Sequence, residues 1–173
     1  MVLRVLDALG AAEEVDRCIL CGPAAEIVEG VPEIRDRIAS GAVRWMPNQA
    51  TPSTSAWSAL TSLAPETPVL LTTADHALLS APVVDHFCRE ARGLRCDVAA
   101  GLASHSLTVA RYPGMRRTKT RFSDGPFCGC NLFAFLTPES RAAANLWRQV
   151  EHQRKQPLKM IGALGWMTVL RYA

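Results

Sequence analysis

The segment that most constrains the fold is PVLLTTADHALLSAP, residues 68–82, because it joins an apolar run to a single carboxylate and then to a helix start. Residues 69–71 show no polar alternation, which is typical of a strand covered on both faces in a parallel sheet. Asp75 follows the end of this strand, where open α/β sheets bind their ligands. We therefore expect Asp75 to lie where substrate phosphates and a divalent cation meet. The alternative is that Asp75 only caps a turn.

The rest of the chain alternates apolar strands with helices and short loops. We expect strands at residues 17–21, 43–46 and 98–103, a helical turn at 24–28, and helices at 2–9, 32–41, 56–63, 81–91 and 137–155. Residues 48–55, rich in turn formers and hydroxyls, are expected to be a loop that leads into a helix. This order predicts a single α/β domain over residues 1–173, with three α/β/α layers around a mostly parallel sheet.

Composition excludes several function classes. The formal net charge of +3 is too small to predict nucleic-acid binding. No apolar run reaches the roughly 18 residues that a transmembrane helix needs, and the N-terminus lacks the pattern of a signal peptide. We therefore expect a cytoplasmic protein without a nucleic-acid or membrane partner.

The six cysteines predict packing rather than a metal site or disulfides. Cys18 and Cys21 would point to opposite faces of a strand, which is awkward for a shared metal. Cys128 and Cys130 would share one face of a strand and could bind a metal or pair with each other. Cytosolic chains, however, usually keep such thiols reduced and buried.

A basic segment at residues 111–121 precedes a second candidate strand. Its cations are Arg111, Arg116, Arg117, Lys119 and Arg121. The segment is either a solvated hairpin or a phosphate-binding element, because guanidinium groups match phosphate oxygens in bidentate geometry. Directly after it, Gly125 and Gly129 flank an apolar stretch and Asn131 precedes Leu132. We expect a close approach of small residues and a carboxamide at a strand start, although Asn131 could also be a simple turn residue.

Four segments together resemble the MobA-like nucleotidyltransferases, which have the GT-A type α/β fold. VLRVLDAL resembles the first helix after the family's nucleotide loop, and TPSTSAWSAL resembles the serine-rich helix start that faces the nucleotide. PVLLTTADHALLSAPVVDHF resembles the strand, metal-binding acid and following helix, and FCGCNLFAFLTPES resembles the later Gly-Asn strand. The resemblance implies transfer of a nucleoside monophosphate from an NTP to a phosphorylated acceptor, with release of pyrophosphate and with magnesium as cofactor.

The resemblance also implies roles for individual residues. Asp75 would hold magnesium, and the reaction needs no acid or base from the neighbouring His76. The nucleotide would lie against Asn48, Ser53 and Ser55. The acceptor would lie against Arg116, Arg117, Lys119, Arg121, Gly129 and Asn131.

Two alternative functions stay open, the first because of a departure from the family and the second because of the shared fold. Family members have a first strand and a glycine-rich loop before the first helix, and this chain begins at that helix. We therefore expect a partial domain that is poorly stable or self-associating when expressed alone, and one alternative is an inactive or regulatory remnant that binds nucleotide weakly. The other is a sugar-nucleotide-dependent glycosyltransferase, although TTADHAL lacks the D-x-D pair of those enzymes.

Overall fold

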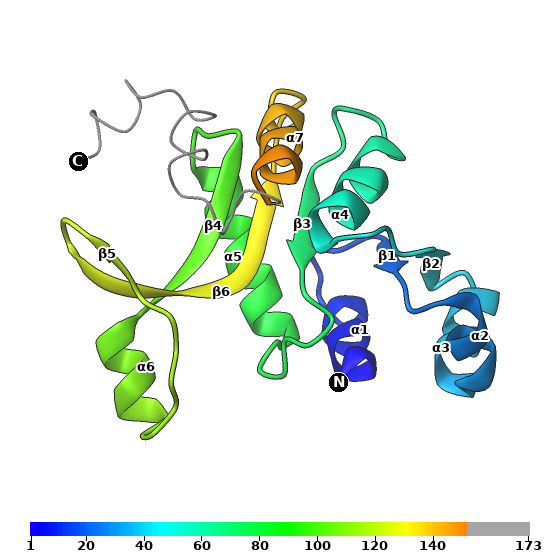
Figure 1. The fold of residues 1–173 in the computed structure, drawn as a ribbon, viewed down its shortest axis with the longest axis horizontal. Helices are drawn as coiled ribbons and strands as arrows, with labels where there is room; N and C mark the ends of the chain where they lie inside the picture. Colours follow the sequence, from blue (N-terminus) through cyan, green and yellow to red (C-terminus); the bar gives the residue numbers. More distant parts are fainter. Residues whose placement is uncertain (152–173) are drawn as a thin grey trace.

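The computed structural model describes residues 1–151, so the predicted end of the last helix at residue 155 lies outside the described residues. The helices are α1 (Val2–Gly10), α2 (Ala25–Gly30), α3 (Pro32–Ala39), α4 (Pro52–Thr61), α5 (Ala81–Gly93), α6 (His105–Arg111) and α7 (Ser140–Glu151). The strands are β1 (Cys18–Cys21), β2 (Val43–Met46), β3 (Val69–Thr72), β4 (Val98–Ser104), β5 (Thr120–Phe122) and β6 (Gly125–Phe135). This alternation confirms the predicted α/β class (Figure 1).

The strands form two separate sheets. β1 and β2 pair in parallel, whereas the larger sheet has the order β3–β6–β4, with β5 also paired to β6. β6 runs antiparallel to both β3 and β4, so these two strands point in the same direction. Within residues 1–151, β1 and β3 each pair on one side only.

Helices cover both faces of the larger sheet, which confirms the three predicted layers. On one face, Leu70 of β3 packs with residues of α1 and α5, among them the fully buried Val84. On the other face, Val69 and Leu71 pack against Leu60 of α4 and a residue of α7. Alternate side chains of a strand point to opposite faces, so β3 holds both helical layers in place.

Helix α4 begins at Pro52, four residues before the predicted start at Ala56. Thr51 is its N-cap: the Thr51 Oγ1 accepts from the Thr54 backbone N–H at 3.2 Å, and the Thr54 Oγ1 accepts from the Thr51 N–H at 3.0 Å. Pro52 then occupies the first turn, where its missing N–H costs nothing. The hydroxyls of Thr51 and Thr54, which were predicted to lie in a loop, therefore form a capping box at the start of α4.

The segment before and within β6 differs from the prediction. Residues 105–111 form the unpredicted helix α6, and the basic segment continues from its last residue through a loop into β5. β6 begins at Gly125, so Asn131 lies inside the strand rather than at its start. The register to β4 shifts at this point, because Ala100 pairs with Phe133 but Leu102 pairs with Gly129. Asn131 therefore lies in a β-bulge.

All six cysteines are free thiols; Cys128 is buried and the other five are half-buried. Burial raises the pKa of the Cys18 and Cys21 thiols, which keeps them protonated and unreactive. Residues 1–151 contain no group of three or more His, Cys, Asp or Glu side chains suited to a metal. Among the helices described, none has the length and apolar character to cross a membrane.

The split sheet generates a prediction about solution behaviour. An open strand edge exposes unpaired N–H and C=O groups that pair readily with other chains. We expect the 173-residue chain, expressed alone, to self-associate, and its β1 and β3 amides to exchange hydrogen faster than those of β6, which pairs on both sides. Sedimentation across a concentration series and hydrogen exchange measure both effects. A monomer that melts cooperatively, with equal protection in β1 and β6, would contradict the prediction.

Candidate functional site

Asp75 lies in a turn beyond the carboxyl end of β3, as predicted. The turn is closed by the backbone, because the His76 N–H donates to the Thr73 carbonyl at 3.2 Å. The Asp75 side chain is exposed and makes no hydrogen bond or ion pair within residues 1–151. The turn therefore forms without its carboxylate, which argues against a capping role and leaves both oxygens available to a ligand.

Asn131 is brought to the same place by strand pairing. Leu132 of β6 pairs with Thr72 of β3, and the Asn131 Nδ2 donates to the Thr73 Oγ1 at 3.4 Å. Asn131 has a φ of 52°, and bulges of this kind re-aim a side chain beside functional sites. With Nδ2 directed at Thr73, the amide Oδ1 has no protein partner among the described residues and can accept a ligand.

The bulge depends on a glycine that sequence patterns did not single out. Gly101 lies opposite the register shift, and a Cβ there would come within 3.1 Å of the Leu132 Cβ. By contrast, a Cβ on Gly129 would meet no atom within 4 Å. Gly129 therefore contributes its carbonyl rather than its small size, and Gly101 supplies the close approach.

Arg117 of the basic segment anchors on this bulge. Its Nη2 donates to the Gly129 carbonyl at 2.9 Å. The pKa of His76 is lowered by burial and by the positive charge of Arg117, against the opposing effect of Asp75. The His76 Nδ1 lies 3.3 Å from the Thr72 Oγ1. Arg117, His76 and Asp75 are thus near neighbours, and the lowered pKa favours a neutral imidazole.

The structure brings Asp75, Arg117, Gly129 and Asn131 together, as the sequence prediction requires. It adds Thr73, whose contact with Asn131 follows from the register between β3 and β6. It also places Arg117 near His76, the sequence neighbour of Asp75. The other three predicted acceptor contacts, Arg116, Lys119 and Arg121, are exposed and have no partner within the described part of the chain.

The predicted nucleotide contacts lie at the end of the other sheet. Asn48 is exposed beyond β2, and a Cβ on Gly22, whose φ is 82°, would come within 3.1 Å of the Asn48 Cβ. The loops after β1 and β2 are therefore in close contact. Ser55 fixes the second loop on α4, because its Oγ accepts from the Gln49 N–H at 2.9 Å and donates to the Thr51 carbonyl at 3.0 Å.

Ser53 has a different environment from the one predicted. It is 0% exposed, and its hydroxyl donates to the Glu151 Oε2, which joins the start of α4 to the end of α7. The Ser53 hydroxyl therefore has no exposed surface to offer a nucleotide. Its contact with Glu151 is structural.

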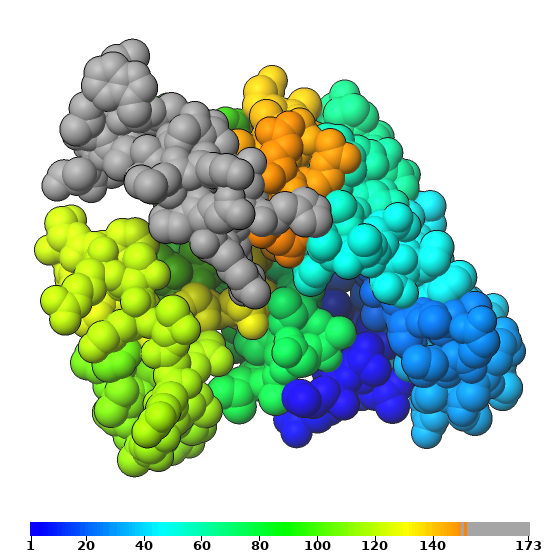
Figure 2. Space-filling model, viewed as in Figure 1, coloured from blue at the N-terminus to red at the C-terminus, as the bar shows by residue number. Residues whose placement is uncertain are grey.

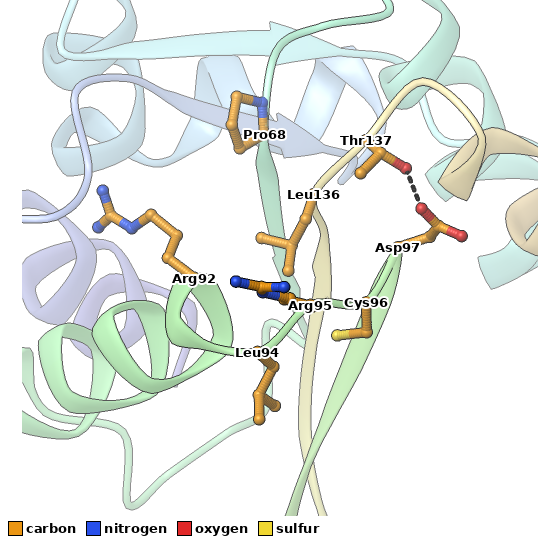
Figure 3. Close-up of a pocket in the computed structure, with 8 residues that line it drawn as sticks. All are labelled: Pro68, Arg92, Leu94, Arg95, Cys96, Asp97, Leu136 and Thr137. Carbon is orange, nitrogen blue, oxygen red and sulfur yellow. Dashed lines mark hydrogen bonds between the residues drawn. The ribbon is translucent and has the colours of Figure 1, made fainter.

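A pocket of about 390 Å³ lies at the opposite end of the strands of the larger sheet, where β3 and β4 begin (Figure 3). Arg92 and Arg95 line it, and Arg92 also pairs with Glu14. Its single acid, Asp97, accepts from the Thr137 hydroxyl at 2.7 Å. This pocket therefore lacks the free carboxylate that distinguishes the Asp75 site.

A known protein family matches most of the chain. The family model of the MobA-like NTP transferase domain matches residues 1–160. The chain belongs to this family. No curated protein sequence matches this MobA-like chain.

Two solved structures are similar to this MobA-like chain. One, described as a hypothetical transferase from Thermus thermophilus, has a TM-score of 0.73 and 25% identity over 99% of this chain and 67% of its own. The other is 4-diphosphocytidyl-2C-methyl-D-erythritol synthase from Anaerococcus prevotii DSM 20548, with a TM-score of 0.58 and 16% identity over 87% of this chain and 65% of its own. The present chain thus spans about two thirds of each, and the second shows the fold alone.

The electrostatic contact at the site is directly testable. Replacing Arg117 with Gln removes a positive charge that lowers the pKa of His76, so this pKa should rise. NMR titration of the His76 ring protons measures the change. Arg116→Gln is the matched control, and an equal rise in both variants would show that Arg117 is not the specific neighbour.

Proposed function

We propose that this MobA-like chain transfers a nucleoside monophosphate from an NTP to a phosphorylated acceptor and releases pyrophosphate, with magnesium as cofactor. One observation carries the proposal. The bulge in β6 directs the Asn131 amide to Thr73, two residues before Asp75, whose carboxylate has no partner within residues 1–151, while Arg117 is anchored on the same bulge. An acid, an amide and a guanidinium group at one sheet end form a site for phosphate chemistry.

The residues present fit magnesium. Mg²⁺ prefers oxygen ligands and is usually held by one or two carboxylates, with substrate phosphates and water completing the shell. The Asp75 carboxylate, the Asn131 Oδ1 and the Thr73 hydroxyl are the donors that would hold it. When bound, the ion would neutralise charge on the phosphate oxygens.

The side chains align the two substrates. An oxygen of the acceptor phosphate attacks the α-phosphorus, a new O–P bond forms, and the bond to the β-phosphate oxygen breaks as pyrophosphate leaves. Arg117 keeps donors free beyond its bond to Gly129 and can bind the acceptor phosphate. The exposed Arg116, Lys119 and Arg121 add positive charge around it. This arrangement requires positioning rather than covalent catalysis, so His76 needs no proton-transfer role.

The nucleotide is proposed to lie on the side of Asn48, whose loop is fixed by Ser55. The rival function is a module that binds nucleotide weakly without transfer. Calorimetry with each NTP in the presence and absence of magnesium, together with pyrophosphate release in the presence of sugar phosphates, separates the two functions. NTP binding without pyrophosphate release, whichever acceptor is present, would favour the binding module.

Asp75→Asn tests the metal site. The exchange removes negative charge where a cation is expected, at an exposed residue that makes no hydrogen bond or ion pair within residues 1–151. We expect magnesium-dependent transfer to fall about 100-fold or more, with an unchanged melting temperature. Asp16→Asn, at an equally exposed acid in the loop after α1, is the control. Transfer within a few-fold of the unmodified chain would exclude Asp75 as the metal ligand.

A second variant tests the acceptor side. Neutralising Arg116 and Arg117 together should raise the KM for the acceptor about tenfold or more and change the KM for the NTP much less, since charge-assisted hydrogen bonds contribute roughly 1.5–3 kcal/mol. Steady-state kinetics with each substrate varied in turn gives both values. Arg44→Gln, an exposed cation on β2, is the control. Equal increases in the KM for the acceptor and for the NTP would show that these arginines do not act specifically on the acceptor.

A further inference from the structure

Residues 105–122, here called the arm, combine exposed apolar side chains with positive charge. The arm comprises α6, the following loop and β5, and it extends from the end of the larger sheet, away from α1 and α4 (Figure 1). Its charged residues are Arg111, Arg116, Arg117, Lys119 and Arg121, and it contains no Asp or Glu. The arm is therefore strongly cationic in a chain whose total formal charge is only +3.

The apolar residues of the arm face solvent. α6 contains no buried residue, and Leu107 is 71% exposed. The other exposed large apolar side chains of the arm are Val109, Tyr112, Met115 and Phe122. Figure 2 shows this part of the chain as a lobe at the lower left of the molecule. Scattered single apolar residues are ordinary on a surface, but here five exposed ones fall within one short cationic segment. Of these five, Phe122 packs edge-to-face on Phe127, with the ring centroids 5.9 Å apart.

We propose that the arm docks this protein on an anionic lipid surface. Clusters of four to eight Lys and Arg residues are attracted to anionic headgroups, and apolar side chains among them insert at the headgroup boundary. Both properties occur in the arm, in the same short stretch. Surface docking needs no membrane-crossing helix, so the absence of one in residues 1–151 is consistent with it.

Charge favours this occupant over two others. A second copy of the chain would bring two cationic arms together in a symmetric contact, and like charges across an interface repel. A nucleic acid would satisfy the cations through its phosphates but would leave the aliphatic Leu107, Val109 and Met115 without partners. An anionic lipid surface satisfies both sets of side chains.

The proposal does not depend on the proposed transfer reaction. Leu107, Met115 and Arg111 lie outside the residues assigned to magnesium, nucleotide or acceptor. Variants at these three positions therefore test docking separately. Pyrophosphate release in solution, measured with soluble acceptors, should be unchanged by them.

Co-sedimentation with vesicles tests the proposal. The 173-residue chain should bind vesicles that contain phosphatidylserine in phosphatidylcholine, should not bind phosphatidylcholine alone, and should dissociate as salt is raised. Leu107→Ser with Met115→Ser should weaken binding about tenfold or more. Arg111→Gln should weaken it about fivefold, which corresponds to the contribution of one cation near the surface. Ile27→Ser and Arg44→Gln, at exposed positions on α2 and β2, are the matched controls.

Four results would overturn the proposal. The first is no binding to anionic vesicles by a chain that circular dichroism shows to be folded. The second is equal loss of binding in the arm variants and the controls. The third is salt-sensitive binding of single-stranded DNA, without vesicle binding, that the Leu107 and Met115 variants leave unchanged; this result would point to nucleic acid. A dimer that the same variants dissociate would equally overturn the proposal, because it would point to a second copy of the chain.

Discussion

The candidate site depends on the antiparallel course of β6 between β3 and β4. Pairing with β3 sets Leu132 opposite Thr72, which brings Asn131 to Thr73. Pairing with β4 on the other side forces the bulge that turns Asn131 to a positive φ. A slip of one residue in either ladder would reverse the side-chain directions of β6 and remove the amide from the site.

The part of this arrangement that sequence could predict is local. An apolar run followed by an acid located Asp75 correctly, because both the burial pattern and the strand end are encoded within residues 69–75. The bulge was not predictable, because it arises from the register between β4 and β6 and from the room that Gly101 leaves for Leu132. The start of α4 was misplaced for a different reason, since TPST is both a typical loop and a capping box.

The two halves of the proposed site rest on separate sheets. Asn48 follows β2 of the smaller sheet, in a loop that Ser55 of α4 fixes, whereas Asp75 follows β3 and Asn131 lies in β6 of the larger sheet. Helices connect them: α1 contacts both β1 and α5, and α4 contacts both β1 and α7. The buried Ser53–Glu151 contact strengthens the second connection. In the proposed function, the position of a nucleotide relative to Asp75 would therefore depend on helix packing rather than on continuous strand hydrogen bonding.

Arg117 joins the arm to the site. One of its N–H groups is committed to the Gly129 carbonyl, which fixes the guanidinium beside the bulge and close enough to lower the pKa of His76. Its remaining donors have no partner within residues 1–151 and can meet an anion, so less side-chain freedom is lost when one binds than for an unanchored arginine. Arg116 lies next to it in sequence but has no such anchor within residues 1–151. A phosphate bound at this site would therefore be oriented mainly by Arg117, while its neighbours contribute charge.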